Sequence, residues 1–529
     1  MIYPMQELFS GNQNIYFLWG LSDSLPEVFK ADTLLNTPDP YPLFSWIIGL
    51  VPVTFLAFWS AFLYIILQAV YSFSLFGIAD RIGGIYSNQK QLLAFTTLFL
   101  LIHANAIWGP YFSIQLGTDL RWIWDSGIAE QGVLRGYLQP SVFGVFFLLS
   151  FFLTASRKFP AAILSLAPAA AMHGGYLFLA AMLTIGLIAY ARFDKKTIAA
   201  SALLLVLALP YSAYILHHFV MLDASTLNSI NSSVLAGFKE NIHLNPANWL
   251  NPKLYIQIAI FGIATSLIWR DKISKLLVAI FLIGTCLTIA AYLFNATTLL
   301  SLNPWRFSVI LIPISSTILL VKTVRSNWWK NNRLPILVGT GIICVAIVYF
   351  RLFGNGSPQF LEVWNPIHLS ALLLSVFAVK WGLTRLTSKS FYGTEYLVIT
   401  ALIVTGMTES YVDAVTREST DEFMAISAVA SRPEPSTVYI VPASWTSFRL
   451  NAKKAVFVDE NLVYGPALPS ISNRLTMLKR AKKSGDYTEI ISTIPDSISI
   501  KLITKDDRVP TSKFDSASIG RNMRCYTLR

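Results

Sequence analysis

The chain is dominated by a succession of apolar runs, and most of them are about as long as a membrane-spanning helix. A helix needs roughly 20 apolar residues to cross the hydrocarbon core of a bilayer. Only 13% of the residues are charged, whereas a soluble protein carries about 25%. The sequence therefore predicts an all-α polytopic transmembrane fold with about 11–13 helices. Candidate spans lie at residues 43–79, 91–108, 140–156, 160–191, 197–218, 253–270, 274–295, 305–322, 334–352, 365–384 and 394–410.

Two of these runs are too long for a single span. Residues 43–79 predict an interfacial or tilted segment followed by a full helix. Residues 160–191 predict two helices that meet at His173, Gly174 and Gly175. The first helix of this hairpin is short for a span, so we expect it to be broken or only partly embedded.

Basic residues gather in the short loops between alternate runs, which the positive-inside rule places in the cytoplasm. The longer loops of mixed charge then lie on the far side, together with the C-terminal tail. These outer regions are 1–42, 109–139, 218–252, 296–305, 353–364 and 411–529. The net charge of +12 thus follows from topology and does not predict a nucleic-acid partner. Residues 1–42 fall outside with no helix before them. Either a first transmembrane helix is missing from this chain or these residues are translocated unaided, and we favour a missing or mis-assigned start.

Three domains are predicted: an outer first loop at 1–42, a multi-spanning domain at 43–410 and a soluble tail at 411–529. TVYIVP at 437–442 and KAVFVDE at 454–460 are short β-branched runs bounded by turn formers, which predict strands. Residues 470–483 begin with serine and predict a helix. The tail is therefore expected to form a small extracytoplasmic α/β domain.

Cysteine and histidine usage points away from several classes of site. Cys286, Cys344 and Cys525 give no disulfide framework. No pair of histidines has the helical spacing of a metal site, so none is predicted from the residues alone. The apolar runs contain almost no ionisable groups, and a proton-coupled transporter needs such groups near the bilayer midplane.

The first outer loop contains the acidic residues Asp32 and Asp39, with prolines at 38, 40 and 42. Proline restricts the backbone between these acids and the membrane. A carboxylate held at the membrane surface can act as a general base toward a hydroxyl group within hydrogen-bond reach. The alternative is that Asp32 caps a helix that begins at Thr33.

The second outer loop, GTDLRWIWDSGIAEQGVLRGYLQPSVFG at 117–144, is dense in charged and aromatic residues. Arginine binds phosphate in a bidentate manner, and tryptophan either stacks on a sugar or marks the membrane interface. The interface alone does not explain the density of acids and arginines. The candidate substrate-binding residues from this loop are Asp119, Arg121, Asp125 and Gln139.

Three further residues are candidates for substrate binding in the outer region. His173 precedes two glycines, which let a backbone approach a ligand closely, although a tight turn also explains them. His243 lies among turn-forming residues in the third outer loop. Arg306 stands at a helix entrance, where it either binds a lipid phosphate or serves as a snorkelling anchor.

An ordered set of stretches resembles a family of bacterial multi-spanning proteins whose architecture is similar to the GT-C superfamily of membrane glycosyltransferases. The resemblance covers nearly the whole chain, and no single motif carries it. The stretches are GNQNIYFLWGL, ADTLLNTPDPYPLFS, YLQPSVFGVFFLLS, AAAMHGGY, IHLNPANWLNP, NPWRFSV, VPASWTSFRL and KKAVFVDE.

The resemblance implies transfer of a sugar from a polyprenyl-phosphate donor to an extracytoplasmic acceptor, which is a lipid-linked glycan, a polysaccharide or a protein. Asp32 would be the catalytic base, with Asp39 also binding substrate. Arg121, His173, His243 and Arg306 would bind the lipid phosphate and position the acceptor, and Arg449 would be the contribution of the tail. A divalent cation, Mg²⁺ or Mn²⁺, is compatible with this chemistry but is not required by it.

The resemblance also implies a bacterial inner membrane as the location and membrane lipid as a partner. Two departures stand out: Asp32 and Asp39 are not adjacent, and the WWD motif of oligosaccharyltransferases is absent. Two alternatives remain from the sequence. One is a polysaccharide polymerase or ligase, and the other is a non-catalytic transporter or assembly subunit.

Overall fold

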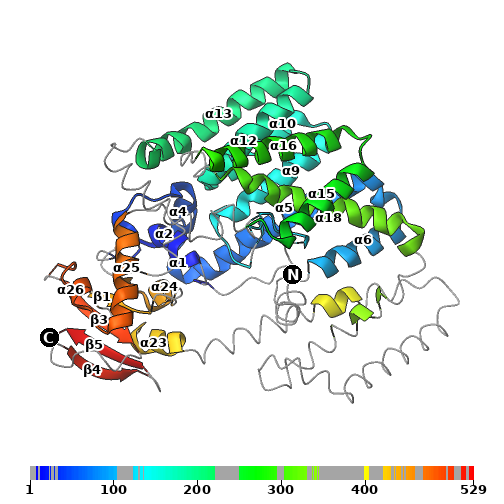
Figure 1. The fold of residues 1–529 in the computed structure, drawn as a ribbon. Coiled ribbons are helices and arrows are strands. Elements are labelled where there is room, and N and C mark those ends of the chain that lie inside the picture. The colour runs from blue at the N-terminus through cyan, green and yellow to red at the C-terminus, as the bar shows by residue number, and fades with distance from the viewer. Residues whose placement is uncertain are drawn as a thin grey trace, which may run out of the picture.

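The structure, a computed structural model, describes most of the membrane part and most of the C-terminal domain (Figure 1). The described residues are 8–9, 12–22, 24–25, 29, 32, 34–103, 123–128, 131–134, 136–220, 249–294, 303–329, 336–337, 339–341, 344, 398–403, 421–430, 434, 437–442, 445, 448–458, 469–495, 498–504, 514–519 and 523–528.

The membrane part is a bundle of apolar helices. Within the described ranges, four helical segments are long and apolar enough to cross a membrane: Val53–Gly83, Lys195–His218, Lys272–Leu293 and Pro304–Arg325. Five shorter apolar helices accompany them, so the chain is a multi-pass membrane protein. The helices are α4 (Pro42–Gly49), α5 (Leu56–Gly83), α6 (Gln89–Ile102), α9 (Val145–Ala155), α10 (Phe159–Leu164), α11 (Ala167–Met172), α12 (Gly174–Tyr190), α13 (Lys195–Ile215), α15 (Pro252–Leu267), α16 (Lys272–Leu293) and α18 (Ser308–Arg325).

Both long runs divide as the sequence predicts. The first forms the short helix α4 and then the long helix α5, and the two are separated at Pro52, whose backbone is extended. The second forms α10 and α11, each with proline in its first turn, followed by α12. His173 has an extended backbone between α11 and α12, so the predicted break at this residue is confirmed.

Helix α18 lies at the centre of the bundle and contacts α5, α6 and α15. Most residues of α18 are buried. In contrast, α13 leaves several large apolar side chains exposed, including Leu203, Leu205 and Leu207. Without water in the hydrocarbon core, an exposed apolar face is compatible with lipid. The bundle therefore has a protein-covered centre at α18 and a lipid-exposed side at α13.

The first loop, which the sequence predicts on the outer side, contributes short helices that rest on the membrane bundle. They are α1 (Gln13–Tyr16), α2 (Leu18–Ser22) and the 3-10 helix η1 (Leu34–Asn36). Helix α2 packs against α4 at Gly20, where a Cβ atom would collide with the Ser45 carbonyl. This close approach fixes the loop against α4.

The C-terminal domain is a five-stranded sheet with helices on both faces, so the predicted small α/β domain is confirmed in its class. Its elements are α23 (Asp421–Ala430), β1 (Thr437–Ile440), α24 (Phe448–Ala452), β2 (Ala455–Val456), α25 (Pro469–Ser484), α26 (Thr488–Ile491), β3 (Ser499–Thr504), β4 (Phe514–Ile519) and β5 (Met523–Leu528). The strand order is β2-β1-β3-β5-β4. Strands β2, β1 and β3 are parallel, whereas β5 is antiparallel to β3 and β4.

Alternate residues of β1 face two different apolar layers. Val438 and Ile440 belong to the large core that extends through the membrane bundle, and Tyr439 packs in a separate core with α23 and α24. Figure 1 shows this domain beside α1 and α2 of the first loop. The domain therefore shares its core with the membrane part.

Candidate active site

The centre of the candidate site is Arg306, which lies on the 3-10 helix η10 (Pro304–Phe307) at the start of α18. Its Nη1 atom lies 3.2 Å from Nε2 of His173, and its guanidinium lies 5.3 Å from the ring centre of Tyr176. Gly175 permits this arrangement, because a Cβ atom there would lie 3.1 Å from Nε of Arg306. The helix hairpin and η10 thus meet at one point.

His173 is approached by two donors, one at each ring nitrogen. The Gly175 amide donates to Nδ1 at 3.1 Å, while Nη1 of Arg306 faces Nε2. A neutral imidazole has one acceptor nitrogen and one N–H, so it satisfies only one of these donors. A protonated ring would satisfy neither and would add a second positive charge. An anion placed beside Nε2 and the guanidinium would accept from both.

Arg306 has no carboxylate partner within the described part of the chain. Its Nε atom is buried and lacks a hydrogen bond there. Burying a cationic group without a counter-charge is costly. The arrangement therefore favours binding of an anion from outside the protein, and guanidinium matches phosphate in shape and hydrogen-bonding geometry.

A row of tyrosines connects this cationic centre to the first loop. Tyr176 donates its hydroxyl hydrogen to the Ser141 carbonyl at 2.8 Å and packs against His173. On the other side, the ring of Tyr41 lies 5.2 Å from that of His173 and 5.0 Å from that of Tyr16. The site is therefore walled by aromatic rings, which suit contacts with sugar or lipid.

Asp39 lies at the loop end of this wall. Its Oδ1 atom accepts a 2.7 Å hydrogen bond from the Tyr41 amide, and the hydroxyl of Tyr211 in α13 donates to the Pro40 carbonyl at 2.9 Å. Asp39 is half-buried, and burial raises the pKa of its carboxyl group above the ordinary value. A partly exposed carboxylate with a raised pKa has the properties of a proton acceptor.

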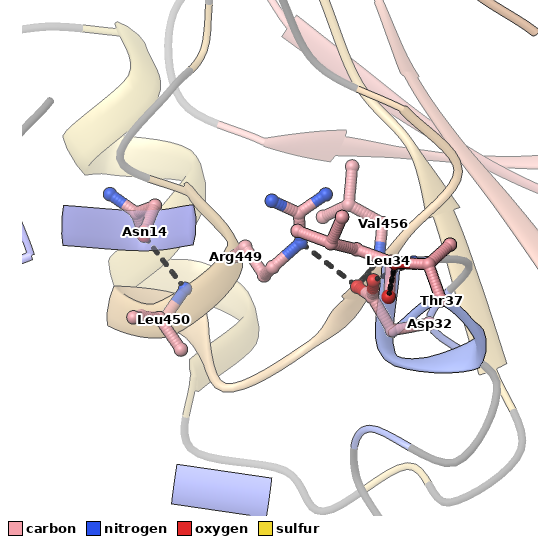
Figure 2. Close-up of polar contacts among 7 residues, drawn as sticks. All are labelled: Asn14, Asp32, Leu34, Thr37, Arg449, Leu450 and Val456. Atoms are coloured by element: carbon pink, nitrogen blue, oxygen red, sulfur yellow. Dashed lines mark hydrogen bonds and ion pairs between the residues drawn. The ribbon is translucent and has the colours of Figure 1, made fainter. Parts of the chain in front are cut away.

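Asp32 has a different environment, which Figure 2 shows. Its exposed fraction is 0%. Oδ2 accepts from Nε of Arg449 at 2.9 Å and from the Val456 amide at 3.0 Å, and Oδ1 accepts from the Leu34 amide at 3.0 Å. The bond to Leu34 is the capping contact that the sequence left open as an alternative, one residue later than expected. The role of Asp32 as a general base stays a prediction.

Arg449, the candidate from the tail, is 1% exposed and forms its ion pair with Asp32. The two residues are 417 positions apart. The structure thus brings two predicted site residues together in a buried pair. His173 and Arg306 meet in a second, aromatic cluster, and Tyr41 connects this cluster to Asp39.

The remaining predicted residues divide into two groups. Asp125 and Gln139 are buried, and Asp125 accepts from the Ser126 hydroxyl at 2.8 Å. Asp119, Arg121 and His243 lie outside the described residues.

The sequence pattern alone does not mark Tyr16, Tyr41 or Tyr176 as site residues. Tyr41 and Tyr176 lie beside candidate residues, in DPYP at 39–42 and HGGY at 173–176, whereas Tyr16 has no such neighbour. Among the described residues, no group of three or more His, Cys, Asp or Glu side chains is placed to hold a metal ion. The Mg²⁺ or Mn²⁺ site compatible with the sequence therefore has no support from this part of the chain.

No protein-family model matches the sequence, and no curated protein matches it. Among solved structures, the chain is similar to the crystal structure of ArnT from Cupriavidus metallidurans bound to undecaprenyl phosphate. The two share 9% sequence identity, and the similarity covers 99% of this chain and 94% of the other, with a TM-score of 0.42.

Proposed function

We propose that this protein is a membrane glycosyltransferase that moves a sugar from a polyprenyl-phosphate donor to an acceptor hydroxyl on the outer side of the membrane. The observation that carries the proposal is Arg306, a half-buried guanidinium whose contacts in the described chain are His173 and the ring of Tyr176 rather than an acid. An apolar bundle next to a cationic, aromatic site suits a ligand with a lipid tail and a phosphate head.

The reaction follows from the chemistry of these groups. The bond between the sugar C1 and the phosphate oxygen breaks, and a bond from C1 to the acceptor oxygen forms. Polyprenyl phosphate leaves with an additional negative charge, which Arg306 and an N–H of His173 stabilise where it develops. The acceptor loses its proton to a carboxylate.

Asp39 is the carboxylate that best fits this last role. A general base has to reach the proton that it removes. Asp39 is half-buried and lies next to the aromatic wall, whereas Asp32 is fully buried with both oxygens already accepting hydrogen bonds. In place of the role that the sequence predicts for Asp32, we therefore propose Asp39 as the proton acceptor and Asp32 as a supporting residue.

Binding of a polyprenyl phosphate to the purified protein in lipid nanodiscs tests the phosphate site. We expect Arg306→Gln to weaken binding at least tenfold, as loss of a charge-assisted bidentate contact is worth about 1.5–3 kcal/mol. Arg81→Gln is the matched control, because Arg81 is exposed and bonds only to the Ser156 hydroxyl in the described chain. Equal binding by both variants would remove Arg306 from the site.

Transfer itself is tested in a deletion strain of the native host, by mass spectrometry of envelope glycans and lipid-linked sugars. Loss of one glycosyl unit, with build-up of its polyprenyl-phosphate sugar, is the expected result. It should recur with Arg306→Gln at normal protein level. An unchanged glycan profile in the deletion strain would favour the non-catalytic alternative.

A further inference from the structure

The C-terminal domain is held on the first outer loop by buried polar contacts. Besides the pair between Asp32 and Arg449, the side-chain oxygen of Asn14 accepts from the Leu450 amide at 3.1 Å. Asp32, Asn14 and Arg449 are each at most 1% exposed. Figure 2 shows both contacts, which involve the adjacent residues Arg449 and Leu450 of the short helix α24. The domain and the loop therefore meet through an interface from which water is excluded.

A buried ion pair is a poor means of gaining stability, because removing two charges from water offsets much of their attraction. Apolar contacts already join the two parts, since Leu450 and Phe457 share a core with Phe17 and Phe29. The ion pair instead fixes the position of the Asp32 carboxylate relative to the C-terminal domain. With Val456 and Leu34 as additional donors, the carboxylate of Asp32 has one position that satisfies all its bonds.

The chain between Asp32 and Tyr41 is short and constrained. Helix η1 follows Asp32, and the Thr37 hydroxyl donates to the Leu34 carbonyl at 2.7 Å. The indole N–H of Trp19 donates to the Thr37 carbonyl at 3.3 Å. Proline at 38 and 40 then fixes φ on both sides of Asp39. Because this segment is short and restrained, a displacement of Asp32 also displaces Asp39 and Tyr41.

We propose that Arg449 is a positioning residue: through Asp32, the C-terminal domain sets the position of Asp39 and Tyr41 relative to Arg306. This inference rests on the proposed function for its catalytic readout. It assigns Arg449 no contact with substrate, in contrast to the substrate-binding role implied by the sequence resemblance. The C-terminal domain then contributes to catalysis indirectly, through its contact with the first loop at Asp32.

The kinetic test uses Arg449→Met, with Arg449→Lys as the conservative variant. We expect Arg449→Met to lower kcat at least tenfold per folded molecule and to leave the affinity for a polyprenyl phosphate within twofold, because Arg306 and His173 are untouched. Arg449→Lys keeps the charge and should recover part of kcat. Glu434→Gln is the control, since it breaks the 2.6 Å ion pair with Lys501 elsewhere in the domain.

Hydrogen exchange provides a readout that is independent of transfer. The backbone amides of residues 34–41, apart from Pro38 and Pro40, which have no N–H, should exchange faster in Arg449→Met than in wild type or Glu434→Gln. Unchanged exchange there overturns the positioning role, and so does an unchanged kcat or a tenfold loss of phosphate affinity. If exchange rises while even the wild type transfers no sugar, the proposed function fails and the positioning of the loop stands.

Discussion

At the scale of single residues, the two carboxylates of the first loop have opposite environments. Asp32 is fixed by three hydrogen bonds and fully buried, whereas Asp39 is half-buried beside the aromatic wall. Burial raises the pKa of Asp39. A base works only when deprotonated, so its activity falls as the pH drops through that raised pKa. The acid limb of the pH profile should therefore lie above the ordinary range of an aspartate.

The prediction at this scale compares Asp39→Asn with Asp32→Asn. Asp39→Asn should lower kcat/KM about 10²–10⁴-fold and abolish the acid limb of the profile. Asp32→Asn should lower kcat/KM by a smaller factor than Asp39→Asn does. It should keep the acid limb of the pH profile, because Asp39 is still present. Steady-state kinetics from pH 4 to 9 on folded, nanodisc-embedded protein measures both. An acid limb that disappears with Asp32→Asn but persists with Asp39→Asn would reverse the assignment.

At the scale of elements, the position of Arg306 depends on how η10 packs against α16. Gly284 of α16 faces Phe307, the residue that follows Arg306, and a Cβ atom at 284 would collide with its ring. Gly284→Ala should therefore destabilise the protein by about 1–3 kcal/mol and shift η10. Gly262→Ala in α15 is the control, since its Cβ would meet nothing within 4 Å.

Thermal unfolding and polyprenyl-phosphate binding of the two alanine variants measure this effect. A lower melting temperature and weaker binding are expected for Gly284→Ala, and neither for Gly262→Ala, where alanine favours the helix. If Gly284→Ala loses stability but binds normally, the packing of α16 does not control Arg306.

The elements that the sequence predicted well are those set by local pattern. The hairpin break at His173, the division of 43–79 and the first strand of the tail all follow from apolar periodicity and from proline or glycine. The pairing of Asp32 with Arg449 could not be predicted, since it depends on how a distant domain docks. The aromatic wall could not be predicted for the same reason, because its tyrosines come from α1, the first loop and α12.

At the scale of the whole molecule, the candidate site and the basic loops lie at opposite ends of the same helices. Helix α12 has 17 residues, which span about 25 Å, close to the thickness of a bilayer core. His173 precedes it at the site, and Arg192 follows it, next to Lys195 and Lys196. If the positive-inside rule holds for that loop, the site and the C-terminal domain face the outer side together.

Labelling with a membrane-impermeant maleimide tests this topology. The background is a variant whose three cysteines are replaced, because Cys286 is exposed. In right-side-out vesicles, Ser484→Cys on α25 should react and Lys196→Cys at the start of α13 should react only after permeabilisation, since both positions are exposed in the structure. The opposite pattern would place Arg306 and the C-terminal domain in the cytoplasm. A glycosyltransferase at this site would then have to use acceptors from the cytoplasmic side, so the sidedness of one loop decides which acceptors the proposed site can reach.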